Sequence, residues 1–179
     1  MIIEEQIPLL EEILTEWKII MGKDYLGYKN HVYRMLHCCF ALHKAIDEER
    51  DKLIIAACFH DLGLWSEKSV DYLPPSIILA RQYLEKNKQD HWSTEIELII
   101  DMHHKISKFT NESYPLVEVF RKADLADFSL GLFKGGVPED YIKQLRVTFP
   151  NAGFHKMLLK KQVKWLIKHP LNPFPIIKW

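Results

Sequence analysis

One stretch organises the chain: residues 53–63, with the sequence LIIAACFHDLG. The run is apolar until His60 and Asp61, which stand side by side at its end. Polar groups are costly in such surroundings unless they are paired or bind a metal. Histidine and aspartate are both good ligands for first-row divalent metals. Because two adjacent ligands cannot fill a coordination sphere, we expect the rest of the chain to supply more.

The composition indicates a globular protein with one sizeable core. Of the 179 residues 47% are hydrophobic, and 24 Lys and Arg balance 24 Asp and Glu. The zero net charge argues against a general nucleic-acid or membrane-surface binder. The cysteines, Cys38, Cys39 and Cys58, are interpreted as free thiols in a reducing compartment. The N-terminus lacks a secretory pattern, and no apolar run approaches the ~20 residues that span a bilayer. We therefore expect a cytoplasmic protein.

Helical periodicity runs through most of the chain, and no segment has a convincing strand or hairpin pattern. Pro8 is expected near a helix start and Gly22 as a helix stop, while Asn30 could cap the second helix and Gly63 could end the third. The expected helices are 2–21, 30–46, 51–62, 76–86, a helix that starts near 93 and ends near 104, 115–132, 138–149 and 154–168. Residues 64–75 are expected to form a loop, and the tail 169–179 to pack in an extended form. This pattern predicts an all-α, compact bundle of seven to nine helices.

Further candidate ligands lie before and after the His60-Asp61 pair. His31 lies near the start of the preceding helix, and Asp124 lies inside an apolar helix where a carboxylate needs a partner. His103 and His104 end the helix between them. Because two neighbours on a helix point about 100° apart, at most one of these two should face a metal directly. A set of two histidines and two aspartates suits Mn, Fe, Zn, Mg, Ni or Co.

Each candidate also has a structural interpretation. His60 could be tied to a backbone carbonyl, and His31 could form a local hydrogen bond at the start of its helix. Asp124 could pair with Arg121 or Lys122 on its own helix. These alternatives stay open on the sequence alone.

Three residues near the candidates have two interpretations each. Arg34 could hold a phosphate with its planar guanidinium, or pair with a carboxylate on the surface. His104 could contact substrate or be an exposed histidine at a helix end. Trp65 directly follows the His-Asp segment and could belong to a lid or to the core.

The order His31, His60-Asp61 and Asp124, in its helical setting, resembles the H…HD…D signature of the HD-domain metal-dependent phosphohydrolase superfamily. The resemblance covers about residues 28–130, and residues 138–179 would add C-terminal helices and a tail to a single HD-like domain. It implies that His31, His60, Asp61 and Asp124 bind one divalent metal ion. Dimetal relatives usually carry a further histidine on the helix after the pair, and residues 76–85 have none. A second ion could bind only through His103 or His104.

The resemblance also implies a reaction, with one departure. HD nucleotidases often carry a glutamate three residues after the aspartate of the pair, and here that position is Leu64. We expect Asp61 to orient the attacking water, and His104, Arg34 or Lys105 to contact a phosphate.

The function that we expect is hydrolysis of a small phosphorylated metabolite or nucleotide. The alternatives are a hydrolase, hydratase or oxygenase with a non-phosphate substrate, and a non-catalytic binding module. We expect no nucleic acid and no membrane as partners, and a homodimer stays open.

Overall fold

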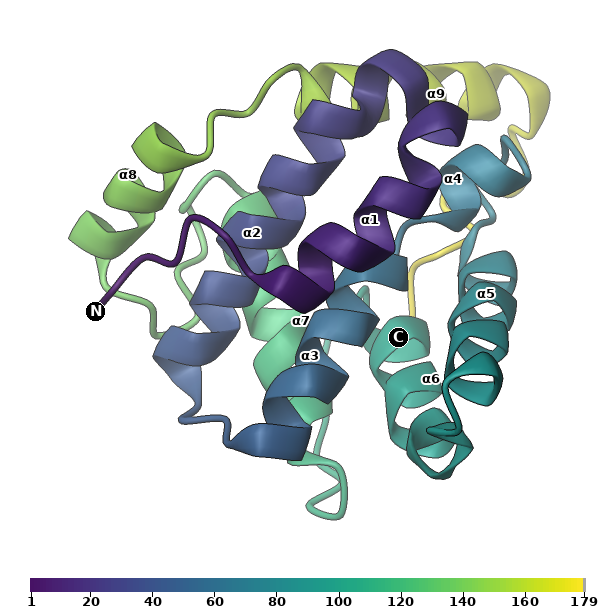
Figure 1. The fold of residues 1–179 in the computed structure, drawn as a ribbon. Coiled ribbons are helices and arrows are strands. Elements are labelled where there is room, and N and C mark those ends of the chain that lie inside the picture. Colours follow the sequence, from purple (N-terminus) through teal and green to yellow (C-terminus); the bar gives the residue numbers. More distant parts are fainter. Residues whose placement is uncertain (179) are drawn as a thin grey trace.

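The computed structural model describes residues 1–178, which form nine α-helices and two short 3-10 helices (Figure 1). Trp179, the end of the predicted tail, lies outside the described residues. The helices are α1 (Pro8–Met21), α2 (Tyr25–Leu42), α3 (Asp47–Phe59), α4 (Gly63–Ser66), α5 (Leu73–Lys86), α6 (Ser93–Met102), α7 (Pro115–Phe128), α8 (Glu139–Thr148) and α9 (Phe154–Lys168), with η1 (Gly22–Asp24) and η2 (Asp90–Trp92). No strand occurs within residues 1–178, only an isolated bridge between Lys105 and Lys178. The predicted all-α bundle is confirmed.

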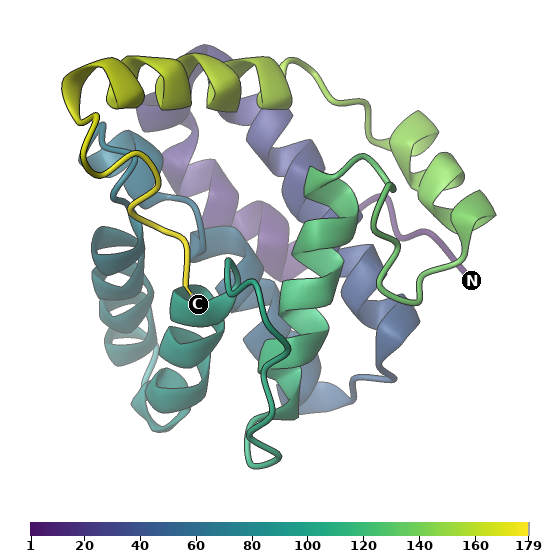
Figure 2. The same ribbon diagram turned by 180° about the vertical axis from the view of Figure 1, so that it is seen from behind.

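Helices α2 and α3 lie at the centre of the bundle. Helix α1 packs on one side of them and α7 on the other, and α7 makes its most extensive contact with α2 (Figures 1 and 2). Helices α5 and α6 pair beside α3, and α9 crosses one end of the bundle. The apolar run in α3 explains this position, because every residue from Leu53 to Phe59 is buried. The free cysteines Cys38, Cys39 and Cys58 are buried in the same core.

Several predicted helix ends are wrong for identifiable reasons. Helix α2 begins at Tyr25 rather than Asn30. Asn30 lies in the second turn of α2, and its side chain donates to the carbonyl oxygen of Pro150 at 2.7 Å, so it does not cap the helix. Helix α3 ends at Phe59, which leaves His60 and Asp61 in the turn after it. The directions of these two side chains are therefore not set by the 100° spacing of an α-helix.

Gly63 does not stop a helix but begins the short helix α4, so the segment after the His-Asp pair is not entirely a loop. A Cβ atom at Gly63 would collide with the carbonyl oxygen of Tyr72 and crowd the ring of Pro75. The glycine therefore allows α4 to approach the start of α5 closely. The amide of Gly63 donates to the hydroxyl of Ser76 at 2.9 Å, which fixes this approach.

The tail after α9 folds back along the bundle to the end of α6, as Figure 2 shows. The indole Nε1 of Trp165 donates to the carbonyl of Asn172 at 2.9 Å, and Gln162 Nε2 donates to that of Pro173 at 2.6 Å. Near its other end the amide of Ile106 donates to the carbonyl of Lys178 at 2.9 Å. The tail is thus held at both ends, with turns between them rather than one extended run.

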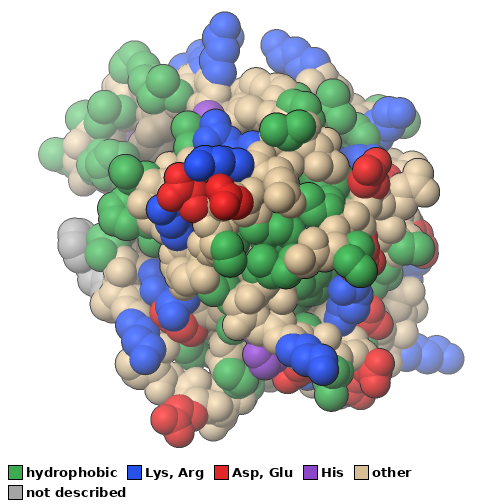
Figure 3. Space-filling view, turned by 90° about the vertical axis from the view of Figure 1, so that its left-hand side faces the viewer, with side chains coloured by type: hydrophobic (Ala, Val, Ile, Leu, Met, Phe, Trp, Pro, Cys, Tyr) green, Lys and Arg blue, Asp and Glu red, His purple; other side chains and the backbone are tan. Residues whose placement is uncertain are grey.

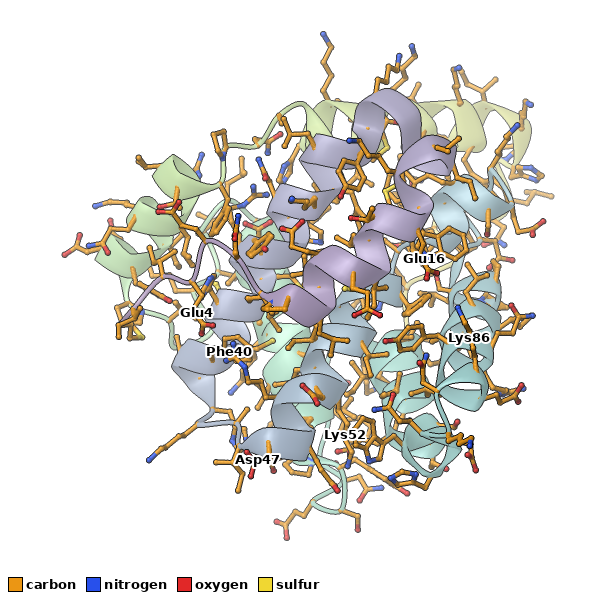
Figure 4. All side chains as sticks on the ribbon, in the orientation of Figure 1. Glu4, Glu16, Phe40, Asp47, Lys52 and Lys86 are labelled. Atoms are coloured by element: carbon orange, nitrogen blue, oxygen red, sulfur yellow. The ribbon has the colours of Figure 1, made fainter. Side chains whose placement is uncertain are left out.

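The outer contacts are mostly exposed ion pairs of ordinary strength. Lys86 of α5 lies 3.8 Å from Glu16 of α1, and both are labelled in Figure 4. Arg50 binds Glu4 at 2.8 Å and lies over the ring of Phe40, which ties the N-terminal segment to the bundle. On the face that carries α8, charges of both signs surround a group of hydrophobic side chains (Figure 3). Such exposed pairs contribute about 0–1 kcal/mol each, so burial of the core dominates the stability.

Candidate metal centre

Three buried histidines present the same nitrogen to one point in the bundle. Their Nδ1 atoms are engaged by an acceptor behind each ring: Asp127 for His31 at 2.7 Å, the carbonyl of Ala57 for His60 at 2.8 Å, and the carbonyl of Ile100 for His103 at 2.7 Å. A carbonyl oxygen only accepts a hydrogen bond, so the proton of the His60 ring and that of the His103 ring lie on Nδ1. The Nε2 lone pairs are then free for a metal, which is how histidine ligands are usually oriented.

The Nε2 atoms of His31 and His60 lie only 3.1 Å apart. Burial lowers the pKa of His60 to about 3, so its ring is neutral. If neither Nε2 atom carries a proton, two lone pairs face each other and repel unless a cation lies between them. Two nitrogens bound to one ion at about 2.0–2.1 Å would lie roughly 3 Å apart, so the observed separation suits a shared ion.

Two carboxylates lie close to the Nε2 atoms of these histidines. Asp124 Oδ1 lies 3.5 Å from His31 Nε2 and 3.9 Å from His60 Nε2. Asp61 Oδ2 lies 3.5 Å from His60 Nε2, and Asp61 Oδ1 lies 3.6 Å from His103 Nε2. We call His31, His60, Asp61, His103 and Asp124 the HD centre. It is built from α2, α7 and the turns that follow α3 and α6.

Two atoms of the HD centre are buried and make no hydrogen bond: Asp61 Oδ1 and His103 Nε2. A buried polar atom without a partner costs about 1–3 kcal/mol, and more when it is charged. A divalent cation would satisfy both atoms, and the donor set of imidazole nitrogen and carboxylate oxygen is one that such ions prefer. The residues present therefore fit a metal.

Ligand atoms of His31, His60 and Asp61 all lie within 4.8 Å of one another, and so do those of Asp61, His103 and His104. Asp61 belongs to both groups, which places its carboxylate between two candidate positions.

A family model, the HD domain, matches residues 28–128, which is more than half of the chain. The chain belongs to the HD-domain family. This confirms the resemblance that His31, His60, Asp61 and Asp124 carry, and it places the protein in a superfamily of metal-dependent hydrolases. No curated protein and no solved structure matches the chain.

Asp124 has no Lys or Arg partner on its own helix, because Glu118 binds the two candidates. Arg121 binds Glu118 in a bidentate pair at 2.8 Å, and Lys122 lies 3.9 Å from the same carboxylate. The alternative pairing of Asp124 with Arg121 or Lys122 is therefore wrong. Burial raises the pKa of Asp124 to about 6, as expected for a carboxyl group among other carboxylates.

Arg34 lies behind the HD centre instead of facing a substrate. Its Nε and Nη2 atoms bind the two oxygens of Asp127 at 2.5 and 2.8 Å, and Nη1 donates to the carbonyl of Phe149 at 2.9 Å. The side chain is buried and does not line the cavity described below. The expected phosphate contact of Arg34 is thus wrong, because Asp127 occupies its guanidinium.

Asp127 is a residue of the site that the sequence analysis missed. Hydrogen bonds from His31 and Arg34 outweigh burial and lower the pKa of Asp127 to about 2, so the carboxylate is ionised. It accepts from His31 Nδ1 and thereby holds the ring with Nε2 toward the HD centre. A signal was present: His31 and Arg34, and Asp124 and Asp127, are both spaced by three residues on helices that face each other.

His104 lies beside the HD centre rather than in it. Its Nε2 lies 2.7 Å from the hydroxyl of Tyr72, and its ring packs on that of His103 with centroids 3.9 Å apart. His103 forms the ion pair with Asp61, at 3.6 Å. Both histidines lie in the turn after α6, so the expected helical angle of about 100° does not separate them, and His104 also has a ligand atom within 4.8 Å of Asp61. Tyr72 is buried at the start of α5 and was not predicted to belong to the site.

The HD centre opens into a cavity of about 550 Å³. His31, Asp61, Asp124 and His104 line its inner end. Its outer end is lined by apolar residues of α9 and the tail that we call the C-terminal wall: Phe154, Leu158, Leu159, Phe174, Ile176 and Ile177. Lys105, a predicted phosphate contact, is not among the lining residues. Neither is Trp65, which is buried against Tyr28 with ring centroids 4.8 Å apart, so the lid interpretation of Trp65 is wrong.

Proposed function

We propose that this HD-domain protein is a metal-dependent phosphohydrolase that acts on a small phosphorylated molecule. One observation carries the proposal. Three oriented imidazoles and two carboxylates, two of whose buried atoms make no hydrogen bond, converge at the inner end of a cavity large enough for a metabolite. Pockets that bind small molecules commonly have volumes of about 300–1,000 Å³.

The residues that would hold the ion are His31, His60, Asp61 and Asp124, with His103 as a further ligand or the start of a second site. A bound divalent ion lowers the pKa of water and polarises a phosphoryl oxygen. The remaining tasks fall to the chain. Asp61 has two carboxylate oxygens, which face His60 and His103 respectively; one can bind the ion while the other accepts a hydrogen bond from the attacking water and so orients it.

His104 is the residue that we assign to the substrate side. It lines the cavity and exchanges a hydrogen bond with Tyr72, which orients its ring. From this position it can donate to a phosphoryl oxygen or carry a proton to the leaving group. Arg34 acts at a distance, because its contact with Asp127 orients His31.

The proposal is tested by metal loading followed by a substrate screen. Protein stripped with a chelator and reloaded separately with Mn, Fe, Co, Ni, Mg or Zn is offered a panel of phosphomonoesters and nucleotides, and released phosphate is measured. We expect release with at least one metal and none from stripped protein. Loaded protein that binds metal but releases phosphate from no ester would contradict the proposal.

A second candidate is hydrolysis or hydration of a substrate without phosphate. It is favoured by the scarcity of cations at the site, because Lys161 is the only Lys or Arg lining the cavity among residues 1–178. The same loaded protein assayed against carboxylic esters, amides and nitriles separates the two. Turnover of these with no phosphate release would favour the second candidate.

A further inference from the structure

We propose that the substrate carries a bulky hydrocarbon or aromatic body, which the C-terminal wall encloses while a single polar head reaches the HD centre. The inference deepens the proposed function and rests on it for the head group. The part that concerns the body stands on the shape and lining of the cavity alone.

The two ends of the cavity differ sharply in chemistry. The inner end is formed by histidines and carboxylates, whereas the C-terminal wall supplies only hydrocarbon and phenyl surfaces. Leu64, Val70 and Phe128 extend this apolar lining along the sides. Two polar residues of α9, His155 and Gln162, also line the cavity. Their side chains are hydrogen-bonded to the carbonyls of Phe128 and Pro173, which uses part of their hydrogen-bonding capacity. A substrate with sugar hydroxyls or nucleobase edges would lose its hydrogen bonds to water here and find few in return. Such a loss costs about 1–3 kcal/mol per group.

The tail part of the C-terminal wall is held in place by hydrogen bonds and an ion pair. Gln162 and Trp165 of α9 hold the first part of the tail through the carbonyls of Pro173 and Asn172. Lys178 anchors the last part, with its ammonium 2.8 Å from the carboxylate of Asp101 in α6. The three apolar tail residues, Phe174, Ile176 and Ile177, lie between these anchors and face the cavity.

The small number of cationic side chains at the cavity also favours a substrate with one small charged head. The ammonium of Lys161 donates to the carbonyl of Leu64 at 2.8 Å and lies over the ring of Trp65, so part of its donor capacity is used. Polyphosphates are usually neutralised by several cations and backbone amides. A cavity with one lysine suits a head with a single phosphate, and it does not suit a nucleoside triphosphate.

Binding of non-hydrolysable ligands tests the inference without turnover. Ethyl-, butyl-, hexyl- and octylphosphonate are titrated into the metal-loaded full chain by calorimetry. If each methylene enters an apolar cavity, the affinity should rise by up to about fourfold per added methylene. The 5′-methylenephosphonate analogue of adenosine monophosphate, which has the same non-hydrolysable head and a polar body, should bind more weakly than octylphosphonate.

Two variants test whether the dependence of affinity on chain length comes from the C-terminal wall. Leu158→Asn places an amide on the cavity side of α9 and should flatten the dependence on chain length. Ile167→Asn is the matched control, because Ile167 lies on the opposite side of the same helix and is 76% exposed; it should leave the dependence unchanged. If Leu158→Asn fails to fold, Phe174→Asn in the half-exposed part of the wall serves instead, with the same expected loss.

The outcomes separate this inference from the proposed reaction. Chain-length dependence without hydrolysis of the matching alkyl phosphates would support the apolar body and count against the phosphohydrolase. An affinity that is independent of chain length, or tighter binding of the adenosine phosphonate than of octylphosphonate, would overturn the inference whatever the protein hydrolyses.

Discussion

The HD centre and the C-terminal wall line the same cavity but are built in opposite ways. At the HD centre each histidine ring is fixed from behind by a specific acceptor, and the ligand residues are at most 5% exposed. The wall consists of residues from the tail and from α9, a helix whose only buried residue is Phe154, and Leu159 and Phe174 are 65% and 55% exposed. A rigid centre holds reacting groups in place, while a wall with few neighbours can change without unfolding the protein. In the function that we propose, the reaction depends on the HD centre and the choice of substrate on the wall.

The largest effect is expected from removing the charge of Asp61, the carboxylate that belongs to both groups of candidate ligands. Asp61→Asn keeps the shape of the side chain but removes its charge, so the protein should lose bound metal. Turnover should fall by at least about 10²–10³-fold, the usual effect of losing one group that stabilises the transition state. Metal analysis and released phosphate measure this. A variant that keeps both its metal and its activity would show that the HD centre is misassigned.

The next effect concerns the acceptor behind His31. Asp127→Asn weakens the hydrogen bond that fixes the His31 tautomer, and metal affinity should fall by about 10–100-fold. Competition with a chelator of known affinity measures the change. Asp140→Asn, on the exposed surface of α8, is the matched control and should leave metal affinity unaltered. Equal affinities for the wild type and Asp127→Asn would mean that His31 is oriented without Asp127.

A smaller effect is expected at the border between the two regions. Tyr72→Phe removes the hydroxyl that contacts His104 but keeps the buried ring. Metal affinity should stay the same while kcat falls by about two- to tenfold, which corresponds to a hydrogen bond of about 0.5–1.5 kcal/mol. Steady-state kinetics of the metal-loaded variant provide the measurement. A kcat that equals that of the wild type would exclude an orienting role for Tyr72.

The sequence predicted the HD centre better than its surroundings. His60 and Asp61 were conspicuous because they end an apolar run, and His31 and Asp124 followed from helical context and order. Arg34 was placed wrongly because its partner Asp127 lies 93 residues away in the chain, and side-chain pairs at that distance depend on how helices pack. The C-terminal wall was missed for a similar reason. The pattern of 154–168 predicts a helix, but not that the tail folds back to enclose a cavity.

The contacts of α2 determine how short a fragment of this protein can be. The family match ends at residue 128, yet Arg34 donates to the carbonyl of Phe149 and Asn30 to that of Pro150. A polypeptide trimmed to residues 28–128 would retain every ligand of the HD centre but leave these two buried donors without acceptors. Each such loss costs about 1–3 kcal/mol, against a total stability of about 5–15 kcal/mol for a typical protein. The turn between α8 and α9 therefore belongs to the smallest piece that can hold the HD centre in shape.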